Sequence, residues 1–211
     1  MRLAILGALF VLSLHVPGAA AAQGEATART GRAVVFLDAD EGVEPFLGVF
    51  LYEVVAGRLR DHGFAVVRGD ASAEASAPLT CFASRECARA TMARRSAPFA
   101  IALHLAERDG RLTVTWARSD GVATTPLEGD EGTVAAALVE ALGALEPARL
   151  PCVWTLEASV AATIEIDGAR ARAPGVVDPG SHRVTVRAPD RDPWSGPLTC
   201  AGARVLRVHA E

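Results

Sequence analysis

Carboxylates gather in one short segment, Asp38-Ala-Asp-Glu-Gly-Val-Glu44, and carboxylates are the side chains that bind calcium. The D-x-D-x-G spacing matches the opening of an EF-hand loop. Position five of that loop is Gly42 and position twelve is Val49, so the bidentate Glu is missing. The pattern favours acids that solvate a loop and stabilise the N-terminal end of the next helix. We predict no metal site and no cofactor, and a cation held by residues 38–44 is the alternative.

Histidines, the usual general acids and bases, are scattered through the chain as His62, His104, His182 and His209. None of them lies in an H-E-x-x-H or G-x-S-x-G context. His104 lies on the face of a predicted strand opposite to its apolar stripe, where partial exposure is expected. The protein is therefore predicted not to be an enzyme. A hydrolase whose catalytic groups meet only in space is the alternative.

Two groups of side chains could recognise a partner. The first is a row of arginines on a helix predicted over 84–95, namely Arg85, Arg89, Arg94 and Arg95. Such a row could bind an anion such as a lipid head group, and a solvated helix face is the simpler interpretation. The second group is Phe46 and Val49, which are apolar but lie off the main stripe of the preceding helix. They either pack against a neighbouring element or form a partner-binding patch.

The first 22 residues have the layout of a secretory signal peptide. Arg2 supplies the positive charge, an apolar run follows to Val16, and Ala20 and Ala22 form a small-residue cleavage site. The run is shorter than the ~20 apolar residues of a membrane-spanning helix. We expect cleavage between Ala22 and Gln23 and an exported chain, periplasmic or extracellular, with no transmembrane segment in the mature form.

Four cysteines in an exported chain indicate two disulfides. Of the three possible connectivities we favour Cys81–Cys87 and Cys152–Cys200, because each pair then lies inside one predicted domain. A zinc site would need more closely spaced ligand pairs, and no histidine stands beside Cys81 or Cys87.

The composition is that of a folded protein. Of 211 residues 50% are hydrophobic and 22% are charged, which excludes a disordered chain and is enough for one or two domains. The formal net charge of −4 leaves no basic footprint for nucleic acid, so nucleic acid is excluded as a partner.

These candidates must be positioned by an α/β domain predicted over residues 32–146. A buried strand over 33–37 precedes a helix that begins at Pro45 and ends before Gly63. A strand over 64–68 and the helix over 84–95 follow. Period-two strands flank the Asp109-Gly110 turn, a further strand is expected over 123–127, and an amphipathic helix over 134–145 ends the domain. The predicted order is β-α-β-α-β-β-β-α, an α+β fold with a mixed sheet.

A second domain is predicted over residues 151–211, after a Pro-punctuated boundary. Short strands are expected over 153–156, 163–166, 183–187 and 204–208, with turns at Asp167-Gly168 and Pro179-Gly180. Short strands at this spacing indicate a small all-β sandwich.

Both predicted domains resemble envelope modules. The segments AVVFLDAD, FAVV, CFASREC and FAIALHLAERDGRLTVTWARSDG, in that order, resemble the N-terminal domain of periplasmic TolB-like proteins and the related CsgG-like proteins. Ala162, Asp167-Gly168, Pro174, Pro179-Gly180 and the His182 that precedes VTV resemble a PEGA domain. The segments 159–162 and 190–194 depart from the PEGA pattern, so no ligand site is carried over. Both resemblances imply binding modules without catalysis.

We therefore expect a non-enzymatic, exported cell-envelope protein that docks on another envelope protein or component. A structural or assembly accessory that acts through oligomerisation is the alternative. Phe46 and Val49 are the predicted partner-binding residues, and Cys81, Cys87, Cys152 and Cys200 are the predicted disulfide residues.

Overall fold

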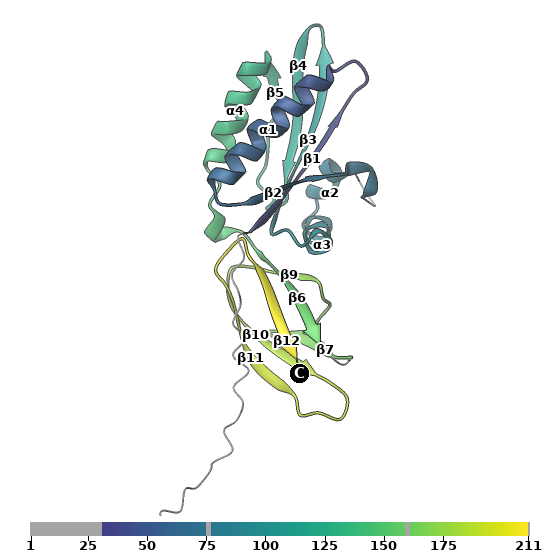
Figure 1. Ribbon diagram of the computed structural model, residues 1–211, viewed down its shortest axis with the longest axis vertical. Helices are drawn as coiled ribbons and strands as arrows, with labels where there is room; N and C mark the ends of the chain where they lie inside the picture. The colour runs from purple at the N-terminus through teal and green to yellow at the C-terminus, as the bar shows by residue number, and fades with distance from the viewer. Residues whose placement is uncertain (1–30, 75–76, 159–160, 211) are drawn as a thin grey trace, which may run out of the picture.

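The computed structural model describes residues 31–74, 77–158 and 161–210. The predicted signal peptide and its cleavage site lie outside these ranges. Two regions follow one another along the long axis of the molecule (Figure 1). The N-terminal region, residues 31–143, holds a five-stranded sheet with its helices, and the C-terminal region, residues 152–210, holds strands in two further sheets.

The sheet of the N-terminal region has the order β2-β1-β3-β4-β5. The central strand β1 pairs in parallel with β2 and with β3, whereas β3–β4 and β4–β5 pair antiparallel. The strands are β1 (Arg32–Ala39), β2 (Ala65–Gly69), β3 (Phe99–Arg108), β4 (Arg111–Arg118) and β5 (Leu127–Gly129). Asp109 and Gly110 both have positive φ in the tight turn between β3 and β4, as their sequence predicts.

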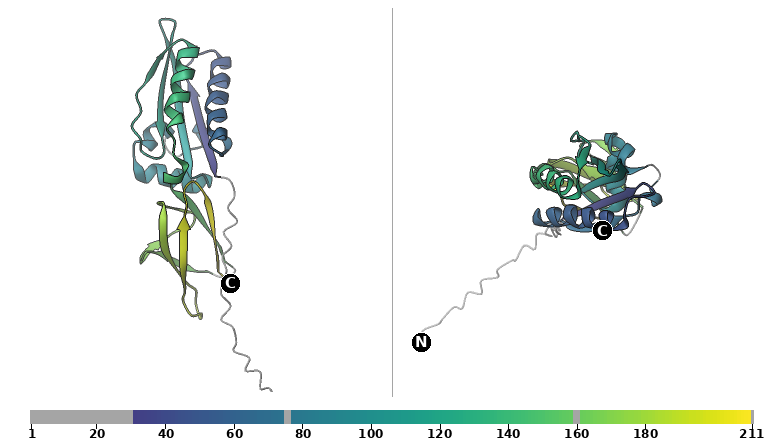
Figure 2. Two further views of the ribbon diagram at one scale, coloured as in Figure 1. Left: turned by 90° about the vertical axis from the view of Figure 1, so that its left-hand side faces the viewer. Right: turned by 90° about the horizontal axis from the view of Figure 1, so that it is seen from above.

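Helices cover both faces of this sheet. On one face lie α1 (Pro45–Asp61) and α4 (Glu131–Gly143), and on the other lie α2 (Pro78–Phe82) and α3 (Arg85–Arg95). Figure 2 shows the sheet between the two helical layers. Among the described residues, no helix is long and apolar enough to cross a membrane.

The alternation of side chains along the central strands explains this layering. In β1, Ala33 and Val35 belong to the core under α1 and α4, while Val34 and Phe36 belong to the core under α2 and α3. In a strand successive side chains point to opposite faces, so an unbroken apolar run is buried on both. To the core under α2 and α3, β3 contributes the small side chains of Ala100 and Ala102, and these allow the short helices to approach closely.

The C-terminal region contains a four-stranded sheet, β11-β10-β7-β8, and a three-stranded sheet, β12-β6-β9. Their side chains form a separate core centred on the buried Trp154. The strands are β6 (Cys152–Ala158), β7 (Thr163–Ile166), β8 (Ala169–Ala171), β9 (Gly175–Val177), β10 (Gly180–Arg187), β11 (Trp194–Cys200) and β12 (Val205–Ala210).

The predicted class, a mixture of helices and strands, is confirmed, because the described residues form several sheets and four α-helices. One strand is misplaced by the prediction: β5 covers Leu127–Gly129 and not 123–127. The reason is chemical. Pro126 has no N–H for a ladder, and the carbonyl of Thr125 accepts a 2.9 Å hydrogen bond from the indole Nε1–H of Trp116. The short elements α2, β8, β9 and β11 were not predicted.

A short segment that includes a 3-10 turn at Pro147–Arg149 joins the two regions, and the contact between them is packed. Leu150 and Ala203 are buried in the core of the N-terminal region. The backbone N–H of Ala203 donates to the carbonyl of Leu150 at 3.2 Å, and Val153 donates to the carbonyl of Arg204 at 2.9 Å. The predicted domain boundary, residues 146–151, is therefore anchored by buried Leu150, while the 3-10 turn within it has no buried residue.

Candidate functional site

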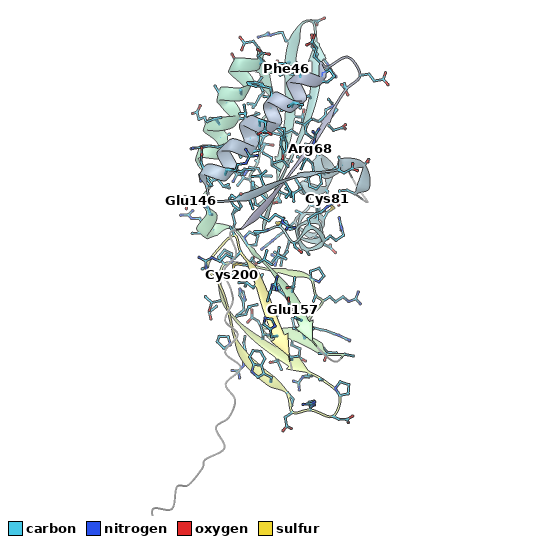
Figure 3. The ribbon with its side chains drawn as sticks, in the orientation of Figure 1. Phe46, Arg68, Cys81, Glu146, Glu157 and Cys200 are labelled. Atoms are coloured by element: carbon cyan, nitrogen blue, oxygen red, sulfur yellow. A yellow bond between two sulfur atoms is a disulfide. The ribbon has the colours of Figure 1, made fainter. Side chains whose placement is uncertain are left out.

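The four cysteines form the two predicted pairs, so the predicted connectivity is confirmed. Cys81 of α2 pairs with Cys87 of α3, and Cys152 of β6 pairs with Cys200 at the end of β11. Figure 3 labels one cysteine of each pair. The first bond fixes two short helices against each other, and the second joins the two sheets of the C-terminal region.

Phe46 and Val49 are exposed, with 61% and 54% of their surfaces accessible. They lie in the first turns of α1. The buried residues of this helix, which include Leu51 and Val55, lie on a different face. The Phe46 ring stacks on that of Phe50 at a centroid distance of 6.1 Å, and Phe50 packs against the core. Phe46 lies at the end of the N-terminal region that is remote from the C-terminal region (Figure 3). We call Phe46, Val49 and Phe50 the α1 patch.

The acidic loop is placed beside a histidine. Nδ1 of His104 lies 3.6 Å from a carboxylate oxygen of Asp38, and Nε2 lies 3.2 Å from one of Asp40. In the described parts of the chain no group of three or more His, Cys, Asp or Glu side chains could hold a metal ion. Glu44 occupies the N-cap position of α1, yet its side chain makes no cap hydrogen bond. Asp38 and Asp40 therefore contact His104, and Glu44 lies at the N-terminal end of α1, as predicted, without a capping hydrogen bond.

Each arginine of the predicted row on α3 binds a carboxylate of the same chain. Arg94 and Arg95 contact the Glu74 carboxylate at 2.7 and 2.6 Å. The Glu74 side chain is only 3% exposed. Arg85 and Arg89 reach across to the C-terminal region and bind Asp178.

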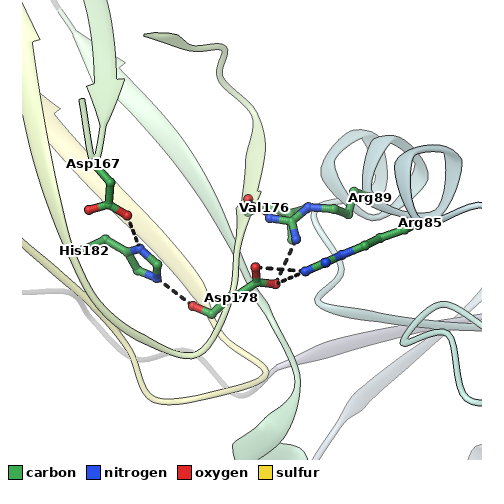
Figure 4. Close-up of polar contacts among 6 residues, drawn as sticks. All are labelled: Arg85, Arg89, Asp167, Val176, Asp178 and His182. Carbon is green, nitrogen blue, oxygen red and sulfur yellow. Dashed lines mark hydrogen bonds and ion pairs between the residues drawn. The ribbon is translucent and has the colours of Figure 1, made fainter. Parts of the chain in front are cut away.

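Asp178, in the turn between β9 and β10, is the centre of the contact between the two regions (Figure 4). Arg85 Nη2 donates to its carboxylate at 3.0 and 3.1 Å, and Arg89 Nη1 donates at 2.8 Å. Arg89 Nη2 also donates to the carbonyl of Val176 at 2.6 Å. Burial raises the pKa of the Asp178 carboxyl, but the guanidiniums of Arg89 and Arg85 outweigh it and lower the pKa.

His182 of β10 holds the same turn from the other side. Nδ1 lies 2.7 Å from the Asp167 carboxylate and Nε2 lies 2.8 Å from the carbonyl of Asp178. Both partners are acceptors, so both contacts are hydrogen bonds only when both ring nitrogens carry protons. The hydrogen bond to Asp167, supported by that to Asp178, raises the pKa of His182. The hydrogen bonds from His182 and from the Arg183 N–H lower the pKa of Asp167.

This network was not predicted as a site. The sequence indicates turns at Asp167-Gly168 and Asp178-Pro179, and His182 was noted only through the PEGA resemblance. Turn signals give no indication that Asp178 meets residues about 90 positions earlier in the chain, since Arg85 and Arg89 precede it by 93 and 89 residues. A cleft of about 690 Å³ opens beside this network, between α2, α3, the segment after β4 and the Asp178 turn.

Comparison with known proteins adds little to this geometry. No protein-family model matches the chain, and no curated protein is significantly similar to it. Among solved structures, the PelC L103M dodecamer from Paraburkholderia phytofirmans is similar at 18% sequence identity with a TM-score of 0.29, over 56% of this chain and 86% of that one. A likeness at this level carries no argument about function.

Proposed function

We propose that the protein is a non-enzymatic, exported binding protein of the cell envelope, and that the α1 patch docks on another envelope component. The observation that carries this proposal is the exposure of Phe46 and Val49 on one rigid helix. The resemblance of the two regions to TolB-like, CsgG-like and PEGA modules supports it. The two disulfides fit an oxidising compartment outside the cytoplasm.

The α1 patch has the properties of an interface centre. Phe46 presents a large ring that loses little conformational entropy when it is bound, because it already stacks on Phe50. Phe46 is remote from the described part of the C-terminal region, which therefore does not cover it (Figure 3). Full burial of a Phe or Val side chain contributes about 1.5–3 kcal/mol, and the exposed half of each would contribute about 1 kcal/mol.

Site-specific photo-crosslinking in an exporting bacterial host tests the proposal. A photoreactive amino acid is placed at position 46 or 49, and at Arg60 as a matched control, because Arg60 is also exposed on α1 but lies about three turns beyond Val49. Positions 46 and 49 should yield one discrete adduct in the envelope fraction that position 60 does not yield. The double variant F46S/V49S should lose about 2 kcal/mol of binding free energy and so weaken binding of that component roughly thirty-fold.

Two outcomes would contradict docking on another component. The absence of any adduct, or equal adducts from all three positions, would remove the role of the α1 patch. An adduct between two copies of this chain would replace docking by self-association and support the assembly accessory instead.

A further inference from the structure

A cleft lies at the contact between the two regions, and no residue of the α1 patch lines it. Its volume of about 690 Å³ lies within the range of ligand sites, roughly 300–1,000 Å³. One wall comes from α2 and α3, the second from the segment that follows β4, and the third from the linker and the Asp178-Pro179 turn. A ligand in this cleft would therefore contact both regions.

The segment after β4 forms a preorganised wall. Arg118, whose side chain is 7% exposed, binds the Asp120 carboxylate through Nε at 3.1 Å and Nη2 at 2.5 Å. The same carboxylate accepts the backbone N–H of Val122 at 3.3 Å. Ser119 Oγ, buried beside it, accepts the backbone N–H of Ala100 at 2.8 Å. These bonds hold the wall in place without a ligand.

The charges that line the cleft are unbalanced. Four arginines and two aspartates contribute to it: Arg85, Arg89, Arg118, Arg149, Asp120 and Asp178. Asp120 is neutralised by Arg118, while Asp178 is shared by Arg85 and Arg89, which leaves one positive charge in excess at that turn. Arg149 adds a further guanidinium and pairs with Glu146 outside the lining.

Arg85 has N–H donors that do not contact Asp178. Its side chain is 77% exposed, and only Nη2 contacts Asp178. Nε and Nη1 make no hydrogen bond to any residue that the structure describes. A guanidinium presents five N–H donors in a planar fork, so the remaining ones can bind a carboxylate, sulfonate or phosphate oxygen without breaking the contact to Asp178.

Apart from the hydroxyls of Ser119 and Thr124, the rest of the lining is mostly apolar. On the helical wall Leu79 is half-buried, whereas Phe82 and Met92 are buried. Pro151 lies on the linker. Val122 stands in the facing wall with 50% of its surface exposed, although it is a large apolar side chain. An inorganic anion would leave this apolar surface unused, whereas a ligand with an apolar body would bury it.

We infer that the cleft binds an organic anion, with its acidic group on Arg85 and its apolar body between Val122 and the α2–α3 wall. Because the ligand contacts both regions, it stabilises their docking by mass action. The site is independent of the α1 patch, so either assignment can fail without the other.

Anilinonaphthalene sulfonate is a suitable probe, because its uncharged counterpart, phenyl-naphthylamine, differs from it only by the sulfonate. Fluorescence titration of the full mature chain should give saturable binding of the sulfonate probe at one site. The uncharged counterpart should bind about ten-fold more weakly, since it makes no charged contact with Arg85.

Matched variants test whether the acidic group of the ligand binds Arg85 and whether its apolar body contacts Val122. Arg85→Gln should weaken sulfonate binding about five-fold, while Arg60→Gln, which alters another exposed, ion-paired arginine, this one on α1, should leave it unchanged. Val122→Ser should weaken both probes about three-fold, while Val67→Ser, an exposed valine on β2, should weaken neither.

Amide chemical-shift changes locate the probe independently of affinity. They should fall in residues 79–92 and 118–124 and not in residues 46–50. Equal binding of both probes, equal effects of Arg85→Gln and Arg60→Gln, or shifts centred on the α1 patch would each overturn the assignment. Binding of inorganic phosphate as tightly as the sulfonate probe would show that the apolar walls play no part and would overturn the ligand class.

Discussion

Deprotonation of His182 should loosen the turn that carries Asp178. The groups that face its ring are the Asp167 carboxylate and the carbonyl of Asp178, and beyond Asp178 lie Arg85 and Arg89 of α3. A neutral imidazole has one N–H and one acceptor nitrogen, so it can donate to only one of its two acceptor partners. Deprotonation therefore removes one hydrogen bond, a net loss of about 0.5–1.5 kcal/mol.

The sign of the pH dependence follows from the direction of the pKa shift. The pKa of His182 is raised in the folded protein above its ordinary value of 6.5. Its contribution to stability is therefore fully present below pH 6.5 and is lost as the pH rises through the raised value. The free energy of unfolding should fall by about 1 kcal/mol on this account on the alkaline side of neutrality.

Urea unfolding of the mature chain, followed by tryptophan fluorescence, to which buried Trp154 contributes, measures this effect at about pH 5.5 and about pH 8.5. His182→Gln should remove about 1 kcal/mol of the pH-dependent difference. His209→Gln is the control, because His209 is half exposed and its contact with Glu157 at 3.3 Å is at the surface. If His182→Gln retains the full pH dependence of the wild type, the two-acceptor argument is refuted.

Two further changes test the packing by equilibrium unfolding. Replacement of both Cys152 and Cys200 by Ala should cost about 4 kcal/mol, because the bond closes a long loop, and retention of wild-type stability would contradict this. Gly69→Ala should cost about 1–3 kcal/mol, since an added Cβ would lie 2.4 Å from ring carbons of Phe36. Gly57→Ala is its control: inside α1 with no atom within 4 Å of the new Cβ, it should gain up to about 1 kcal/mol, and equal losses at both glycines would refute the steric argument.

Local patterns of the sequence determined the larger elements. The apolar spacing after Pro45 predicts the helix that the structure shows as α1, and the Asp109-Gly110 dipeptide predicts the turn between β3 and β4. The helix and the turn each depend on residues within about one element of each other, and backbone periodicity and turn torsions are encoded at that range. The predicted division into two domains selected both cysteine pairs.

Other features depend on residues that meet only after folding. The strands β8 and β9 have three residues each, too few to show a period, and they exist because β7 and β6 pair with them. The sequence does not decide whether Val49 is buried or exposed, because a residue beside an apolar stripe is buried only where another element packs against it. The structure leaves it exposed.

The contact between the two regions was decided by tertiary structure alone. In the sequence, Arg85 and Arg89 are predicted to lie on an ordinary polar helix face, and Asp178 is predicted to lie in a turn. Their ion pairs, the hydrogen bonds of His182 to the same turn and the cleft beside them arise because α3 and the β9–β10 turn are brought together across nearly 90 residues of chain. A sequence pattern records the chemistry of each side chain, but the partner of a charged group at that separation is set by how the two regions pack.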